Sequence, residues 1–169
     1  SVILVLFVAA IAAGSTNLGI MANAVGTLQA YPFVAIVVAG VACAMACYIE
    51  MGKLPFDLAE AEQEIQEGPL AAYSGPSLAM IKLGVSVKQL VVASLFVAIF
   101  LPFGAATTAA PLDLLVGLVS FLFKLLIVML IASVIENSVM RARYKYLGRY
   151  TWFVVGIASL SLVFLVIGI

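Results

Sequence analysis

Residues 50–82 read EMGKLPFDLAEAEQEIQEGPLAAYSGPSLAMIK and lie between two strongly apolar parts of the chain. This segment contains six of the eight acidic residues: Glu50, Asp57, Glu60, Glu62, Glu64 and Glu67. A helix over 56–67 would place four of these on one face, at i, i+3, i+7 and i+10, and would leave Glu62 off that face. We refer to these four as the acidic row: Asp57, Glu60, Glu64 and Glu67.

The crowding of the acidic row points to chemistry at a membrane edge. Neighbouring carboxylates repel one another as anions, so their protonation is expected to be coupled. A row of this kind at the edge of a bilayer predicts a proton or ion relay. Composition alone leaves a solvated acidic loop open as the alternative.

The composition of the whole chain indicates an integral membrane protein. Of its 169 residues, 66% are hydrophobic and 9% are charged, and the mean hydropathy is +1.28. So few polar residues cannot cover a water-facing surface, and continuous apolar runs favour helices over the alternating pattern of a barrel. We therefore predict an all-α, polytopic bundle of about five spans, the first of them truncated. Zero net charge without a basic tract argues against nucleic-acid binding.

Metal and redox chemistry within the chain is restricted by the same composition. The absence of histidine excludes histidine-ligated haem, zinc and non-haem iron sites. Cys43 and Cys47 are spaced i, i+4 in an apolar segment, and two thiols cannot hold an iron–sulfur cluster alone. We expect both to be packing residues and the chain to carry no cofactor of its own.

Five apolar runs define the predicted spans of one membrane domain, residues 1–169. They are Ser1–Ala13, Tyr31–Ile49, Lys88–Phe103 (or from near Leu83), Leu112–Ile135 and Tyr150–Ile169. The first has 13 residues where a crossing needs about 20, so we expect a helix that begins earlier in a longer subunit. Proline and glycine turns, ending with Tyr73–Pro76, divide the predicted acidic coupling loop over residues 50–87.

The distribution of charge predicts an orientation. Two crossings separate the acidic loop from the Arg-rich segment 136–149, so both are expected on one side of the membrane. Every Lys and Arg except Lys124 lies on or near that side, which the positive-inside rule assigns to the cytoplasm. We expect a multi-pass plasma-membrane protein with a cytoplasmic acidic loop and an external C-terminus.

Lys124 is the unusual charge within a predicted span. It lies about 12 residues into its helix, hence roughly 18 Å deep, where an unpaired charge is costly. Its function is interpreted as ion coupling, with an acidic partner expected from another subunit, because this chain offers no obvious intramembrane acid. Snorkelling to an interface is the alternative. Glu136, at the cytoplasmic end of the same helix, is favoured as a boundary residue but retained as a coupling candidate.

A long run of residues resembles a known pattern: Glu50-x-x-Lys53-x-Pro55-Phe56-Asp57-Leu58-x-Glu60-x-Glu62-x-Glu64, followed by Gly68 and Tyr73-Ser74-Gly75. It is similar to E-x-x-R-x-P-F-D-x-x-E-x-E-x-E, then G and E-Y-S-G. That pattern belongs to the quinone-site membrane subunit of respiratory complex I and to its relatives in energy-converting, membrane-bound nickel–iron hydrogenases. The resemblance covers almost the whole chain, because the positions of four further residues also match: Lys124, Arg141, Arg143 and Tyr144.

The resemblance implies a subunit that joins a cytoplasmic redox arm to antiporter-like membrane subunits. The implied role is to pass a redox-driven change into proton or sodium movement through the acidic loop and the buried charges. Iron–sulfur clusters and a nickel–iron site are then expected in partner subunits: a hydrogenase-like large subunit and an iron–sulfur small subunit on the cytoplasmic side. The other expected partner is the lipid bilayer, and no nucleic acid is expected to bind.

The run Glu136-Asn137-Ser138 and the turn Glu67-Gly68-Pro69 resemble the hydrogenase branch, which we therefore favour, and several residues depart from the complex I pattern. Lys53 replaces Arg, Ala72 replaces the Glu of E-Y-S-G, and Glu136 stands where complex I has Arg. A quinone-site subunit of a complex I-type dehydrogenase remains the first alternative. A secondary transporter would predict an internal repeat, which the sequence does not show, and a purely structural scaffold would not need such dense carboxylates.

Overall fold

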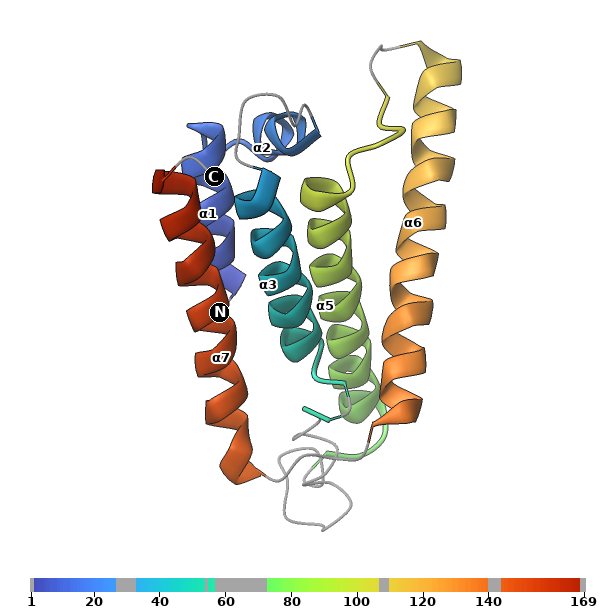
Figure 1. Cartoon of the computed structure of the whole chain (residues 1–169). Helices are drawn as coiled ribbons and strands as arrows, with labels where there is room; N and C mark the ends of the chain where they lie inside the picture. Colours follow the sequence, from blue (N-terminus) through green and yellow to red (C-terminus); the bar gives the residue numbers. More distant parts are fainter. Residues whose placement is uncertain are drawn as a thin grey trace.

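The computed structural model is a bundle of helices (Figure 1) and describes residues 2–26, 33–53, 55–56, 73–106, 110–139 and 144–167. The described helices are α1 (Val2–Ala13), α2 (Leu18–Gly26), α3 (Phe33–Met51), α5 (Pro76–Phe100), α6 (Pro111–Ser138) and α7 (Tyr144–Ile167). Four of them contain stretches long and apolar enough to cross a membrane: Val34–Met51, Pro76–Phe100, Pro111–Ser138 and Gly148–Ile167. The predicted all-α membrane bundle is confirmed, with the first predicted span present as the shorter apolar helix α1.

The start of α5 differs from the prediction for a local reason. α5 begins at Pro76, where proline occupies the first turn and Gly75 precedes it with φ of 61°, and not near Leu83 or Lys88. Lys82 and Lys88 are both exposed, so the helix includes them without burying a charge. Residues 76–87 of the predicted loop are therefore helical.

The small polar segment after α1 contains a helix that the sequence did not predict. Asn17 caps the start of α2, because its side-chain oxygen accepts a hydrogen bond of 2.9 Å from the Gly19 amide. Gly14, with φ of 63°, ends α1 at the predicted position.

The centre of the bundle lies around α3, which packs most closely against α7 and also contacts α1 and α5. The buried cluster between these helices consists of small and β-branched residues: Val5, Ala42, Cys43, Ala46, Cys47, Val154 and Ala158. Small side chains allow helix backbones to approach closely, which is how membrane helices gain packing energy without a hydrophobic driving force. Both cysteines are free and buried here, as predicted, with their sulfur atoms 3.8 Å apart.

One buried hydroxyl joins the two central helices. Ser161 is completely buried, and its Oγ donates a 2.8 Å hydrogen bond to the carbonyl oxygen of Ala35. Ser161→Leu is expected to destabilise the protein by about 1–3 kcal/mol, because it overpacks the α3–α7 contact. Thermal unfolding in detergent measures this loss, with Ser159→Leu as the matched control, since Ser159 is exposed on the same helix. Equal shifts in the two variants would contradict it.

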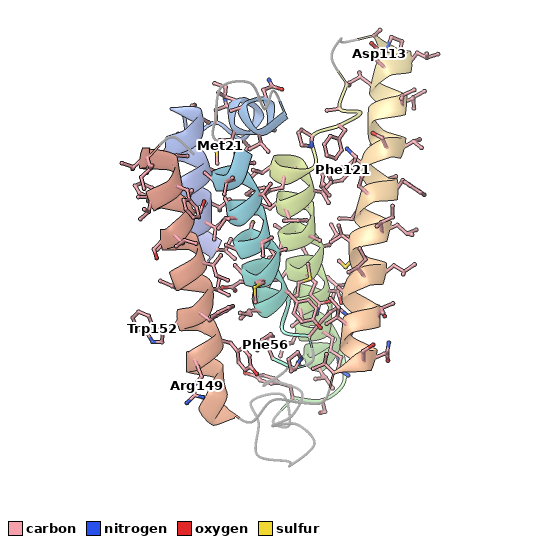
Figure 2. The ribbon with its side chains drawn as sticks, in the orientation of Figure 1. Met21, Phe56, Asp113, Phe121, Arg149 and Trp152 are labelled. Carbon is pink, nitrogen blue, oxygen red and sulfur yellow. The ribbon has the colours of Figure 1, made fainter. Side chains whose placement is uncertain are left out.

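The ends of the helices place the two charged segments together. α3 and α6 end, and α5 and α7 begin, at the same end of the bundle, which we call the loop end (Figure 1). The acidic loop and the segment 136–149 therefore start from one side of the bundle, as predicted. Arg149 and Trp152 point outward near this end (Figure 2), as interfacial anchors do. The acidic row, Glu62, Gly68, Arg141 and Arg143 lie outside the described residues.

Candidate functional site

An ion pair joins α3 to α6 at the loop end. Lys53 Nζ donates to Glu136 Oε2 at 2.6 Å, and the two side chains are only 19% and 29% exposed. Gly52, with φ of 64°, ends α3 and directs the chain toward α6, while Glu136 lies in the last turn of α6. Glu136 lies at the end of its helix, as expected for a boundary residue, and its carboxylate in addition has a specific partner 83 positions away.

A hydrogen bond from α5 fixes the backbone just before Lys53. Gln89 Nε2 donates a 2.9 Å hydrogen bond to the carbonyl oxygen of Met51, the last residue of α3. The turn continues with a 2.7 Å bond from the Phe56 amide to the Lys53 carbonyl oxygen. Sequence reasoning missed Gln89, although an uncharged amide in an apolar span is a signal for a capping role of this kind.

The motif residue Phe56 connects α3 to α7. Its ring makes edge contacts with Tyr48, at a centroid distance of 6.2 Å, and with Tyr150, at 5.4 Å. Figure 2 shows Phe56 between the loop-end parts of these two helices. Beside it lies an apolar cavity of about 590 Å³, with walls from α3, α6 and α7 and with Pro55 among its lining residues.

The other described motif residues have simpler positions. Glu50 lies in the last turn of α3, one helical turn before Lys53. Tyr73 and Ser74 are exposed, and Gly75 starts α5 with a left-handed backbone. Tyr144 is the first residue of α7. Among the described residues, no three His, Cys, Asp or Glu side chains gather as metal ligands do.

Lys124 is paired with carbonyl oxygens of its own chain and not with an acid. Its Nζ donates to the Leu101 oxygen at 2.8 Å and to the Phe103 oxygen, and it lies 5.4 Å from the centroid of the Phe103 ring. α5 ends at Phe100 with Leu101 as its C-cap, so the Leu101 oxygen lies at the carboxyl end of that helix, where partial negative charge accumulates, and the Phe103 oxygen belongs to the turn that follows. Lys124, in the middle of α6, thus has two carbonyl acceptors within its own chain, and an acidic partner from another subunit stays a prediction.

Two more residues of α6 hold the same turn. Ser120 Oγ donates to the Gly104 oxygen at 2.7 Å, and Gly104 has φ of 70°. Gly117 approaches Ala106 so closely that a Cβ at position 117 would lie 3.0 Å from the Ala106 nitrogen. We call this contact the clasp: Gly117, Ser120 and Lys124 of α6 against residues 101–106. Sequence reasoning missed Ser120 and Gly117, although their spacing from Lys124 places all three on one helical face.

The sequence matches one protein family and several known proteins. The model of the NADH dehydrogenase family matches residues 1–167. Hydrogenase-4 component C of Escherichia coli is 47% identical over 167 residues, which cover 99% of this chain and 53% of that protein. Formate hydrogenlyase subunit 4 of the same organism is 47% identical over 161 residues, covering 94% and 52%.

A third relative represents the quinone branch. It is a subunit of the NADH-quinone oxidoreductase of Parvibaculum lavamentivorans, 33% identical over 121 residues, which cover 71% of this chain and 36% of that protein. The chain spans about half the length of the two hydrogenase relatives that it matches.

Proposed function

Since the chain belongs to the NADH dehydrogenase family, whose model matches residues 1–167, we propose that it is a membrane subunit of an energy-converting nickel–iron hydrogenase. In this role it anchors the cytoplasmic redox arm and couples electron transfer from ferredoxin to proton or sodium movement. The observation that carries the branch is the 47% identity to two hydrogenase-complex proteins, against 33% for a protein of an NADH-quinone oxidoreductase.

The ion pair at the loop end supports the same branch. Glu136 occupies the position at which the complex I pattern has Arg, and its carboxylate lies 2.6 Å from the Lys53 ammonium. An arginine at position 136 would face a cation at this distance, and like charges so close repel one another. The complex I pattern also has a cation, Arg, at position 53, so an ion pair between these two positions needs the Glu that this chain has at position 136.

In the proposed mechanism the chain itself transfers no electrons. Iron–sulfur clusters and the nickel–iron site belong to the hydrogenase-like partner subunits, and antiporter-like subunits complete the ion pathway in the membrane. Charge changes in the redox arm act on the acidic row, which follows directly after Lys53 and Phe56 in the chain. The acidic loop lies on the cytoplasmic side and the C-terminus on the outer side of the plasma membrane.

The second candidate function is the quinone-site subunit of a complex I-type dehydrogenase. The apolar cavity of about 590 Å³ beside Phe56 favours it, because a cavity of this size and lining suits an apolar ligand. Analysis of the intact complex in mild detergent separates the two functions. Nickel together with hydrogen evolution from reduced ferredoxin supports the hydrogenase. Bound flavin with inhibitor-sensitive quinone reduction, and no nickel, would establish the alternative.

The coupling role of the acidic row has its own test. Glu60→Gln and Glu64→Gln are expected to impair ion translocation coupled to turnover while the complex still assembles, because each removes a titrating carboxylate but keeps the side-chain shape. Ion uptake by proteoliposomes, normalised to electron transfer, measures this. Asp113→Asn is the control, since Asp113 lies at the end of α6 far from the loop end (Figure 2). Full coupled transport in both glutamine variants would overturn the assignment.

A further inference from the structure

Apolar packing holds α6 to the rest of the described chain over a narrow strip. α5 is its main packing partner, and Ala132 is the only buried residue of α6 within the described part of the chain. Ala132 packs in a small cluster with Ala93 of α5 and Met51 of α3. Leu125, Val128 and Met129 of α6 are partly buried against the same cluster, so the apolar contact of α6 with α3 and α5 lies in the loop-end half of the helix.

Polar contacts secure α6 on either side of this strip. The clasp holds its outer half to the carboxyl end of α5 through Ser120 and Lys124. The Lys53–Glu136 ion pair holds its loop end to the segment that follows α3. The clasp has several bonds from one face of the helix, whereas at the loop end the described contact is one ion pair.

The ion pair also lies at the edge of the apolar cavity. Met51 and Pro55, on either side of Lys53 in the chain, line the cavity, and so do Ile135 and Val139, on either side of Glu136. α6 therefore supplies one wall of the cavity, and the ion pair fastens that wall to the opposite one. Loss of the pair would leave the loop end of α6 free to move about the clasp.

We propose that the Lys53–Glu136 ion pair is a latch that holds the loop end of α6 next to the end of α3 at the edge of the cavity, and that the cavity widens when α6 pivots about the clasp. The proposal rests on the proposed function in one respect, the signal that opens the latch. Asp57, the first residue of the acidic row, follows Lys53 by four positions. A change in the charge of the row is expected to alter the attraction of Lys53 for Glu136, because the row and Glu136 would act on the same ammonium group.

Cys47 provides a natural reporter for opening. It lines the cavity from α3 and is 3% exposed, while Cys43 is completely buried and does not line it. In a Cys43→Ala background of the intact complex, alkylation by N-ethylmaleimide within residues 1–169 is therefore specific to Cys47, and mass spectrometry of the peptide that contains Cys47 measures it. Glu136→Gln is expected to accelerate this alkylation about tenfold, the effect of losing one charge-assisted hydrogen bond.

Controls separate a latch from general loosening. Asp113→Asn removes an acid from the other end of α6 and should leave the alkylation rate unchanged. The exchange Lys53→Glu with Glu136→Lys should restore the slow rate. An unchanged rate in Glu136→Gln, or equal acceleration in Asp113→Asn, would overturn the latch. Because alkylation is measured without turnover, a complex that reduces quinone and lacks nickel would refute the hydrogenase function and leave this result intact.

Discussion

Lys124→Met is expected to destabilise the subunit by about 2–3 kcal/mol, because it removes a charged donor from two carbonyl oxygens at the end of α5. Methionine preserves the apolar stem of lysine and so isolates the loss of the ammonium group. Loss of the ammonium group removes this donor from the Leu101 and Phe103 oxygens, and a carbonyl oxygen that loses its partner costs free energy.

The thermal midpoint of the complex in detergent measures this effect. Lys124→Arg should retain most of the stability, since guanidinium also donates to carbonyl oxygens. Lys88→Met is the matched control, because Lys88 is exposed in the middle of α5. Equal midpoints for Lys124→Met and the parent would show that the clasp does not stabilise α6. Ion transport by the variant, compared at a temperature where it is folded, then tests coupling separately from stability.

The fold was largely predictable from the sequence, because the length of each apolar run determines whether it can cross a membrane as a helix. Long apolar runs have no alternative to crossing a membrane as helices, and α3, α6 and α7 lie close to their predicted ranges. The start of α5 was not predictable in this way, because Lys82 and Lys88 lower the local hydropathy without disfavouring a helix. α2 was missed because its nine residues are too few to cross a membrane and its start is marked by one capping asparagine.

The sequence indicated which residues belong to the candidate site, but it did not indicate which of them contact one another. Lys53 and Glu136 were both candidates, yet nothing in a single sequence pairs positions 83 residues apart. Their contact depends on where α6 lies relative to α3, which is a property of tertiary packing. Lys124 was recognised as costly, whereas its partners could not be, because backbone carbonyls carry no sequence signal. The acidic row lies outside the described residues, so its geometry stays a prediction.

Reversal of one charge in the latch is expected to be as damaging as the loss of Lys124. Lys53→Glu would place a second carboxylate against Glu136 in a half-buried site, and Glu136→Lys would place two ammonium groups there. Each single variant should lose about 1.5–3 kcal/mol, because a charge-assisted hydrogen bond is replaced by repulsion between like charges. The double exchange restores opposite charges at the same positions, so its loss should be much smaller than the sum of the two.

A double-mutant cycle on the thermal midpoint of the intact complex measures this coupling, which is expected to be about 1–3 kcal/mol. Lys88→Glu controls for the change in net charge, because it alters an exposed residue by the same amount. Additive losses in the double exchange would show that the pair contributes no stability. If the double exchange restores stability but not coupled ion transport, then transport requires the cation at position 53, which precedes the acidic row in the sequence, and not at position 136. That outcome is expected if the row controls the latch, because Lys53→Glu would turn its attraction to the row into repulsion.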